Sequence, residues 1–276
     1  MKDQADALRR RALARERAEA LPAAEPPAFV VGSGKGGAGK SVLSLLLASA
    51  LARDRHRVLL VDGAQNQANL HVLLGLPPAR HLSGVLRGET RPESLVVAAA
   101  ERLWLLPAAS GAESVYGLAA VDRARLHQRL TELYDGFDAV VIDAGPGLES
   151  AVRATMRASR LLVVAVPEPA ALSDAYALIK IVTLQAPSLP VDVIVNRVVD
   201  PAEGPAVFAR LSLAARRFLR RDLDYLGAVA EDAALHEGVR RPAALLEAKV
   251  GVVGAIARRL MGEARAVVAP APGGAA

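Results

Sequence analysis

The 276-residue sequence contains no cysteine and has little aromatic character. The absence of cysteine excludes disulfide bonds, thiolate metal sites and cysteine-ligated iron–sulfur clusters. Only 3% of the residues are aromatic whereas 52% are apolar, so any core must be built mainly from Ala, Leu and Val. A chain of this length can form one large domain with a substantial core.

Long hydrophobic runs and a strong excess of one charge are also missing. No apolar run approaches the roughly 18 residues needed to span a bilayer, and no signal-peptide pattern precedes the first apolar segments. The formal net charge of +5 is modest for this length, and arginine carries almost all of the positive charge. We attribute the arginine content to codon usage rather than to a nucleic-acid surface, and we expect a cytoplasmic protein.

A glycine-rich segment at residues 32–41, GSGKGGAGKS, holds two of the five lysines of the chain. From Gly34 to Ser41 it fits the phosphate-binding loop, in which a glycine and four further residues precede Gly-Lys-Ser. Backbone N–H groups of such a loop point at the phosphates, the lysine reaches the β- and γ-phosphates, and the hydroxyl binds Mg²⁺. The predicted nucleotide-binding residues of the loop are Gly34, Lys35, Gly36, Gly37, Ala38, Gly39, Lys40 and Ser41.

Short apolar runs alternate with helical patterns from residue 28 onward. They are continuously apolar, as expected of parallel strands covered on both faces. The pattern predicts an α/β fold, with a doubly wound, mostly parallel sheet of seven or eight strands and helices on both faces. The runs are Phe29–Val31, Val58–Val61, Leu103–Leu106, Ala139–Ile142, Leu161–Val166, Val191–Val195 and Tyr225–Val229.

The composition indicates that the chain consists of four segments. Residues 1–20 are charged and rich in Ala and Arg, which predicts a helix, and the prolines of residues 21–27 predict an extended linker. Residues 28–266 form the predicted nucleotide-binding domain. Residues 267–276 are a Pro/Gly/Ala tail that we expect to be disordered.

Two of the predicted strands end in aspartate. Asp62 follows residues 57–61 and Asp143 follows residues 137–142, at the carboxyl ends where α/β proteins bind ligands. A lone aspartate at such a place is often a helix cap or a turn residue, but a phosphate loop in the same sheet favours a metal site. We therefore predict Mg²⁺ ligation by Ser41, Asp62 and Asp143, with the Gly145 backbone N–H near the γ-phosphate.

Lys35 makes the loop resemble the deviant phosphate loop of the MinD and ParA class of ATPases, KGGxGK[ST]. In that class the extra lysine crosses a dimer interface to the partner's nucleotide. The resemblance therefore implies a homodimer when ATP is bound and a catalytic set of Lys35, Lys40 and Asp62. The alternative is that Lys35 is an ordinary loop residue exposed to solvent.

Within this class, three segments resemble the flagellar-number regulators known as FlhG or FleN. Residues 165–180, AVPEPAALSDAYALIK, are similar to the PEP…DAYALIK stretch of that branch. Residues 69–76, NLHVLLGL, resemble its NLDVLLGL segment, and residues 3–9, DQADALR, fit its N-terminal DQAxxLR helix. Weaker similarity continues to about residue 259. Residues 195–198, VNRV, resemble a strand end whose asparagine reads adenine, which assigns Asn196 and Arg197 to the base.

The N-terminal motif carries the implied partner. In this branch the helix docks on FlhF, a GTPase of the signal-recognition class, and stimulates its GTP hydrolysis. By resemblance, Gln4 is the activating residue, while Asp3, Leu8 and Arg9 hold the helix in place; a glutamine amide can both donate to and accept from an attacking water. The alternative is that residues 1–20 form a solvated amphipathic arm that binds no partner. A flagellar transcription factor or basal-body component is a further possible partner, and contact with the inner membrane is expected only through partners.

The sequence departs from the class after the second predicted strand. The class has Asp-x-Asp at this place, and its second aspartate orients the attacking water. This chain reads Asp62-Gly63-Ala64, so alanine replaces that aspartate. Losing such a group usually lowers the rate by about 10²–10⁴-fold. We therefore expect ATP to be bound and hydrolysed slowly or not at all, unless Gln65 or Asn66 positions the water.

Three further interpretations stay open. Val250, Val253, Ile256, Ala257 and Leu260 form one helical face, for which we expect core packing rather than the membrane binding seen at the C-terminus of MinD-like proteins. A catalytically inactive nucleotide-binding scaffold is one alternative function. A ParA-type partitioning ATPase that binds DNA nonspecifically is another, which the DAYALIK stretch disfavours. Its DNA surface would use Arg216, Arg217, Arg220, Arg221, Arg240 and Arg241.

Overall fold

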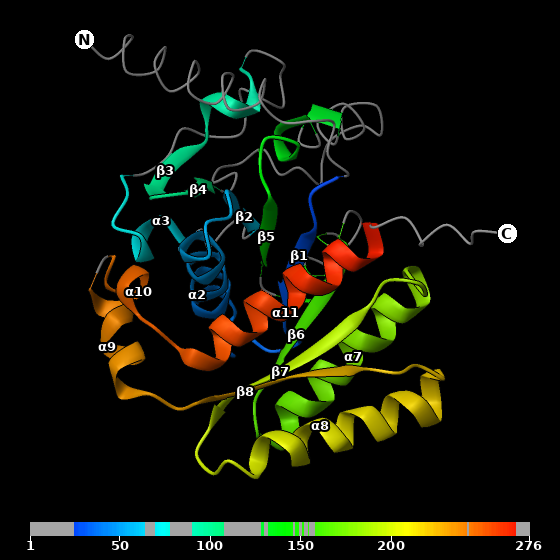
Figure 1. The fold of residues 1–276 in the computed structure, drawn as a ribbon. Helices are drawn as coiled ribbons and strands as arrows, with labels where there is room; N and C mark the ends of the chain where they lie inside the picture. Colours follow the sequence, from blue (N-terminus) through cyan, green and yellow to red (C-terminus); the bar gives the residue numbers. More distant parts are fainter. Residues whose placement is uncertain are drawn as a thin grey trace, which may run out of the picture.

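The strands in the described part of the chain form one eight-stranded sheet (Figure 1). Its strand order is β3-β4-β2-β5-β1-β6-β7-β8, and all neighbours are parallel except β3 and β4. The strands are β1 Ala28–Gly32, β2 Val58–Gly63, β3 Val97–Ala100, β4 Leu103–Leu106, β5 Ala139–Ala144, β6 Arg160–Ala165, β7 Val191–Val198 and β8 Asp224–Ala230. The computed structural model describes residues 25–63, 70–77, 90–107, 128–129, 132–145, 147–148, 151, 154, 158–241 and 243–268.

All seven predicted strands are confirmed, as is the doubly wound parallel sheet. The strand that sequence reasoning did not predict is β3, which lies at the edge of the sheet and runs antiparallel to β4. Its sequence is VAAA, and alanine has a low preference for strands. Pairing with β4 through a tight turn therefore creates a strand that composition does not indicate.

Helices cover both faces of the sheet (Figure 1). On one face α2, α10 and α11 pack together, and on the other face α7 and α8 pack against β6 and β7. The elements are α2 Lys40–Arg53, α3 Leu70–Leu73, η1 Pro92–Ser94, α7 Pro169–Gln185, α8 Glu203–Ala214, its π-helical continuation η4 Ala215–Leu219, α9 Ala233–Arg240, α10 Ala244–Glu247 and α11 Gly251–Val268.

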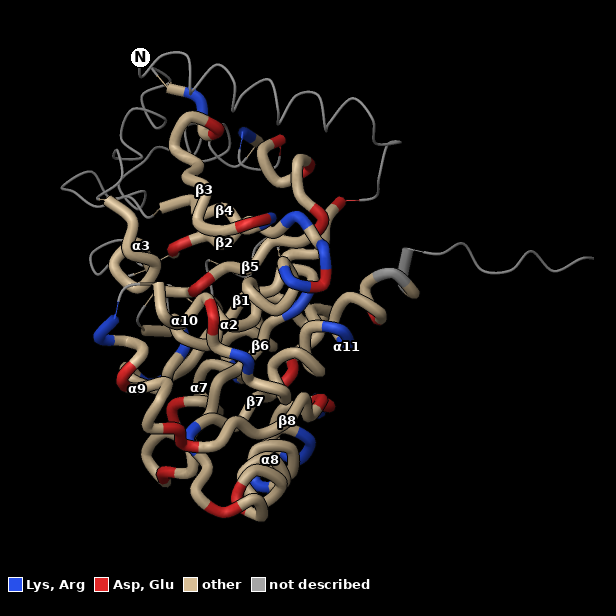
Figure 2. The backbone as a smooth tube through the Cα atoms, turned by 60° about the vertical axis from the view of Figure 1, so that its left-hand side comes forward, with Lys and Arg blue, Asp and Glu red and all other residues tan. Residues whose placement is uncertain are grey.

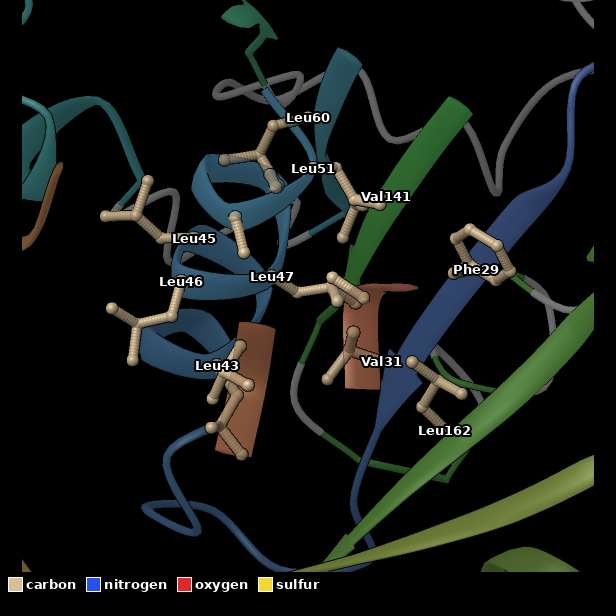
Figure 3. Close-up of a cluster of buried hydrophobic side chains, with 14 of the residues drawn as sticks. Phe29, Val31, Leu43, Leu45, Leu46, Leu47, Leu51, Leu60, Val141 and Leu162 are labelled. Atoms are coloured by element: carbon tan, nitrogen blue, oxygen red, sulfur yellow. The ribbon is translucent and has the colours of Figure 1, made fainter. Parts of the chain in front are cut away.

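The helix that follows the glycine-rich loop, α2, lies at the centre of the molecule. Figure 3 shows its leucines beside Val31 and Val141 of the sheet, with Phe29 further from the helix in the same buried cluster. Its other side is covered by α10 and α11, so residues 43–52 are all buried. A helix that is apolar all round must be enclosed in this way.

The C-terminal helix α11 packs on α2 and β8. Val253, Ile256, Ala257 and Leu260 are buried, so the predicted core packing of these residues is confirmed. Val250, the fifth residue of the predicted face, lies just before the helix and is partly buried against the same core. Among the described residues, no helix combines the length and the hydropathy that crossing a membrane would require. The predicted helix at residues 1–20, most of the linker and most of the tail lie outside the described residues and stay predictions.

Candidate functional site

The glycine-rich loop connects the carboxyl end of β1 to the first turn of α2, as a phosphate-binding loop requires. Gly37 and Gly39 have φ of 78° and 89°, a left-handed conformation that favours glycine. No atom outside the neighbouring residues lies within 4 Å of a Cβ placed on Gly36 or Gly37, so the loop faces open space at these two positions. The loop thus leaves room for phosphate groups beside its backbone.

Close packing against α7 fixes the start of the loop. A Cβ on Gly34 would lie 2.0 Å from the carbonyl oxygen of Asp174, so only glycine fits there. The Ser33 hydroxyl donates to the Lys35 carbonyl oxygen at 2.6 Å and holds the turn between them. The loop is therefore shaped before any ligand arrives, which lowers the entropic cost of binding one.

Lys40 and two aspartates lie together below the loop. Asp62 and Asp143 are paired in register on β2 and β5, and both are buried. The Ser44 hydroxyl donates to the Asp143 carboxylate at 3.2 Å. Burial lowers the pKa of Lys40, and the charge of Asp143 partly opposes that shift. The start of α2 and the ends of β2 and β5 therefore bring a buried lysine and two buried carboxylates to one place.

Electrostatics at this place fit a bound cation. Burial raises the pKa of Asp143 to about 6; hydrogen bonds from Ser41 and Ser44 and the charge of Lys40 oppose the rise, whereas the charge of Asp62 adds to it. A positive ion bound nearby would stabilise the charged form of this buried carboxylate and so counter the raised pKa. Two carboxylates and the Ser41 hydroxyl are oxygen ligands of the kind Mg²⁺ prefers. Ser44, one turn after Ser41, was missed by sequence reasoning, although its spacing on α2 could have indicated it.

Lys35 forms an ion pair with Glu168, the residue immediately before α7. Both side chains are partly exposed, at 39% and 51%. The hydrogen bond from Lys35 lowers the pKa of the Glu168 carboxyl group. Sequence reasoning assigned no role to Glu168, yet its place just after β6 puts it at the carboxyl edge of the sheet, where ligands bind. Lys35 therefore has a partner within its own subunit.

A cavity of about 190 Å³ adjoins the loop between α2, β7 and α9. Asn196 and Arg197, predicted to contact the base, both line it. The Asn196 amide donates to the Ala38 carbonyl oxygen at 2.8 Å, and Arg197, with φ of 62°, pairs with Glu231 at 3.1 Å. Asp232 and His236 also line the cavity; they follow β8, and their place at the carboxyl edge is the signal that could have found them.

Several predicted functional residues cannot be placed. Asp3, Gln4, Leu8 and Arg9 lie outside the described residues, as do Ala64, Gln65 and Asn66. Of the neighbouring residues that are described, the Leu70 backbone N–H donates to the Asp62 carboxylate at 3.3 Å, and Gly145 directly follows β5 in a buried position. The structure thus brings the loop, Asp62, Asp143, Gly145, Asn196 and Arg197 to one edge of the sheet.

Comparison with known protein families gives a match over most of the chain. Residues 29–243 match the CobQ/CobB/MinD/ParA nucleotide binding domain. The chain is 35% identical to the antiactivator FleN of Pseudomonas aeruginosa over 80% of this chain and 79% of that protein. It is 32% identical to the flagellum site-determining protein YlxH of Helicobacter pylori over 77% of this chain and 72% of that protein.

Solved structures agree with these relatives on the fold. The MinC:MinD cell division protein complex of Aquifex aeolicus aligns with a TM-score of 0.67 and 26% identity, over 86% of this chain and 96% of the matched chain. MinD of Pyrococcus horikoshii, solved with Mg-ADP, aligns with a TM-score of 0.69 and 24% identity, over 87% of this chain and 97% of that one. The second likeness concerns the fold alone.

Proposed function

The chain belongs to the CobQ/CobB/MinD/ParA nucleotide-binding family, and from this premise we propose that it is an ATP-switched regulator of flagellar number or placement. The observation that carries the proposal is the similarity to FleN and to the flagellum site-determining YlxH, which extends over more than 70% of each protein. The PEP…DAYALIK stretch adds support, because its glutamate, Glu168, is the residue that holds Lys35. We propose a cytoplasmic location for this regulator.

Binding of Mg·ATP is the first part of the proposed switch. The loop backbone and Lys40 would hold the phosphates, and Ser41, Asp62 and Asp143 would hold Mg²⁺. When bound, the ion offsets phosphate charge. The cavity lined by Asn196 and Arg197 would take the base. These residues come from the ends of four strands, β1, β2, β5 and β7, so one ligand would contact all four.

Dimerisation is the second part. Lys35 is exposed enough to leave Glu168, and an ion pair at such exposure contributes little to stability. The negative charge of a bound nucleotide across an interface offers Lys35 a stronger partner. The proposed ATP-bound state is therefore a homodimer in which Lys35 reaches the partner's phosphates. Slow hydrolysis, proposed because Ala64 lacks an acceptor, would keep this state long-lived.

An FlhF-type GTPase is the proposed partner. The support is the resemblance of residues 3–9 to the helix that activates this GTPase, with Gln4 as the residue nearest the chemistry. Gln4 lies outside the predicted nucleotide-binding domain, so its substitution tests this partner without changing a residue of the nucleotide site.

The alternative of nonspecific DNA binding is disfavoured by where the arginines lie. Arg216, Arg217, Arg220 and Arg221 precede β8, whereas Arg240 and Arg241 lie beyond its carboxyl end, at the opposite edge of the sheet. Arg216 pairs with Asp222, and Arg241 pairs with Glu237. Figure 2 shows basic and acidic segments interspersed along the described chain. Six arginines divided in this way do not make one DNA-binding face.

Flagellar counts in the host organism test the proposed function. Deleting the gene should change the number or placement of flagella seen by electron microscopy. The wild-type gene should restore the original pattern, and a Lys40→Ala gene, made to the same protein level, should not. An unchanged flagellar pattern in the deletion strain would contradict the proposal.

A further inference from the structure

A second cavity, of about 340 Å³, lies at the edge of the sheet opposite the phosphate loop. It opens where α2 ends, beside the turn that joins β3 to β4 and beside α10. The side chains that matter are Ser49, Arg53, Arg55, Glu101 and Arg102. Cavities of roughly this size and larger hold small ligands in other proteins. The lining carries three positive charges against one negative charge, so an anion is the expected occupant.

Two of these arginines occupy backbone positions where glycine would be the easier choice. Arg55 has φ of 68° and Arg102 has φ of 57°, both left-handed. Arg55 closes α2: its N–H donates to the Ala52 carbonyl, a place where glycine is usual. Arg102 lies in the tight turn before β4, where glycine is again favoured. Non-glycine residues held in this conformation tend to serve a site. Two adjacent turns thus accept backbone strain and place guanidinium groups at one cavity.

Backbone carbonyls hold the guanidinium groups at the cavity wall. Arg102 donates from Nη1 to the Arg55 carbonyl oxygen at 3.1 Å, and Arg53 donates from Nη1 to the Leu246 carbonyl oxygen at 3.0 Å. A guanidinium has five N–H donors, so each of these bonds orients the group and leaves further donors for a ligand. The arrangement is pre-formed in the way that limits the entropic cost of binding.

A buried hydroxyl at the same cavity needs a partner. Ser49 is 4% exposed, and its Oγ has no hydrogen-bond partner within the part of the chain that the structure describes. A buried polar atom without a partner is costly, and native structures usually satisfy it. The Ser49 hydroxyl is therefore a second group at the cavity wall that a polar ligand atom would satisfy. This observation is independent of the arginines.

We propose that this cavity is a second anion site, one that binds a phosphate-bearing small molecule. Guanidinium groups match the oxygens of a phosphate through paired N–H donors, better than an ammonium group does. The site is separate from the nucleotide site, since α2 begins at the phosphate loop with Lys40 and ends at this cavity with Arg53. The proposal stands whether or not the flagellar function proves correct.

The test uses inorganic phosphate and the full chain saturated with Mg·ADP, followed by amide chemical shifts in NMR. The wild type should show saturable shifts at residues 53–56 and 100–103. The Arg55→Gly/Arg102→Gly variant should bind phosphate about tenfold or more weakly at this place, because charged hydrogen bonds are lost. Its unfolding temperature should equal or exceed that of the wild type, since glycine relieves the two left-handed positions.

An Arg210→Ala/Arg217→Ala variant is the matched control. It removes the same charge from exposed positions on α8 and η4, far along the chain from the cavity. It should keep the wild-type affinity for phosphate at residues 53–56 and 100–103. The proposal is overturned if the wild type shows no saturable shift at these residues, or if the glycine variant binds phosphate there as tightly as the wild type. It is also overturned if the control variant loses as much affinity, since general charge would then explain the binding.

Discussion

Lys35 in the phosphate loop and Glu168 before α7 form an ion pair across 133 residues of sequence. The pair ties together two segments that sequence reasoning singled out separately, the deviant loop and the PEP…DAYALIK stretch. It also gives the lysine a resting position within one subunit. In the proposed dimer, Glu168 of the same subunit and the nucleotide of the other subunit compete for Lys35.

Replacing Lys35 with alanine should leave ATP bound and the protein monomeric. The backbone amides, Lys40 and the two aspartates remain to hold Mg·ATP, whereas the charge that reaches across the interface is gone. ATP affinity by fluorescence titration and mass by size-exclusion chromatography with light scattering measure the two properties. Lys180→Ala, at an exposed position on α7, is the control that should still dimerise. An ATP-dependent Lys35→Ala dimer would show that the lysine is not needed.

Glu168→Gln should strengthen ATP-dependent dimerisation while changing stability little. The substitution removes the charge that holds Lys35 at rest, and an ion pair as exposed as this one contributes little to the free energy of unfolding. Sedimentation at several protein concentrations gives the dimer dissociation constant, and urea denaturation gives the stability. A weaker dimer in the variant would mean that Glu168 supports the interface instead of competing with it.

Restoring an aspartate at Ala64 should accelerate ATP hydrolysis. The water-orienting carboxylate is worth about 10²–10⁴-fold in rate, so Ala64→Asp should turn over ATP faster by a factor in that range. Steady-state phosphate release from both proteins, with Ala64→Asn as a control of similar size without the charge, is the measurement. Equal rates for the wild type and Ala64→Asp would show that another residue already positions the water.

Gln4→Ala should abolish stimulation of an FlhF-type GTPase without affecting ATP binding. The amide of Gln4 is the proposed contact with the attacking water, and residues 1–20 lie apart in sequence from the nucleotide loop. GTP turnover by the partner is measured with the full-length protein, with Lys2→Ala as the control. Stimulation that survives in Gln4→Ala would assign the effect to another part of the chain.

Asp192 should make stability fall as the pH rises through mildly acidic values. Burial raises its pKa to about 6, although Arg160 binds both of its oxygens at 3.0 Å. As the pH rises, the folded state therefore keeps this proton to a higher pH than the unfolded chain, whose carboxyl pKa is near 3.8. The stabilisation is complete below pH 4 and is lost as the pH approaches and passes 6.

Urea denaturation of the wild type and of Asp192→Asn between pH 4 and pH 7 measures this effect. The variant should show a shallower decline in the free energy of unfolding. Some decline should remain, because the pKa of Asp143 is raised in the same direction. Identical slopes for the two proteins would rule out a raised pKa at Asp192.

The sequence predicts the sheet well because its inner strands are buried on both faces and must be continuously apolar. Strand β3 could not be predicted in this way, because it is an edge strand of one valine and three alanines. Only its pairing with β4 makes it a strand. The loop and the strand-end aspartates are local signals, and the structure brings them to one edge of the sheet. The Lys35–Glu168 pair joins residues far apart in the chain, so no local pattern encodes it.

Backbone conformation limits prediction at the second cavity. Arg55 and Arg102 are unremarkable residues in an arginine-rich sequence, and nothing local marks their left-handed φ. Their meeting depends on the β3–β4 hairpin, which was itself not predicted. The lack of a hydrogen-bond partner for the Ser49 hydroxyl within the described residues likewise results from three-dimensional packing.

The hydrogen bond from the Leu70 N–H to Asp62 links the strand end where a metal ion would be held to the start of α3. If the Asp62 carboxylate turned toward a bound ion, this hydrogen bond would lengthen and the first turn of α3 would lose its anchor. Binding of the nucleotide would then change the order of a segment that begins eight residues further along the chain.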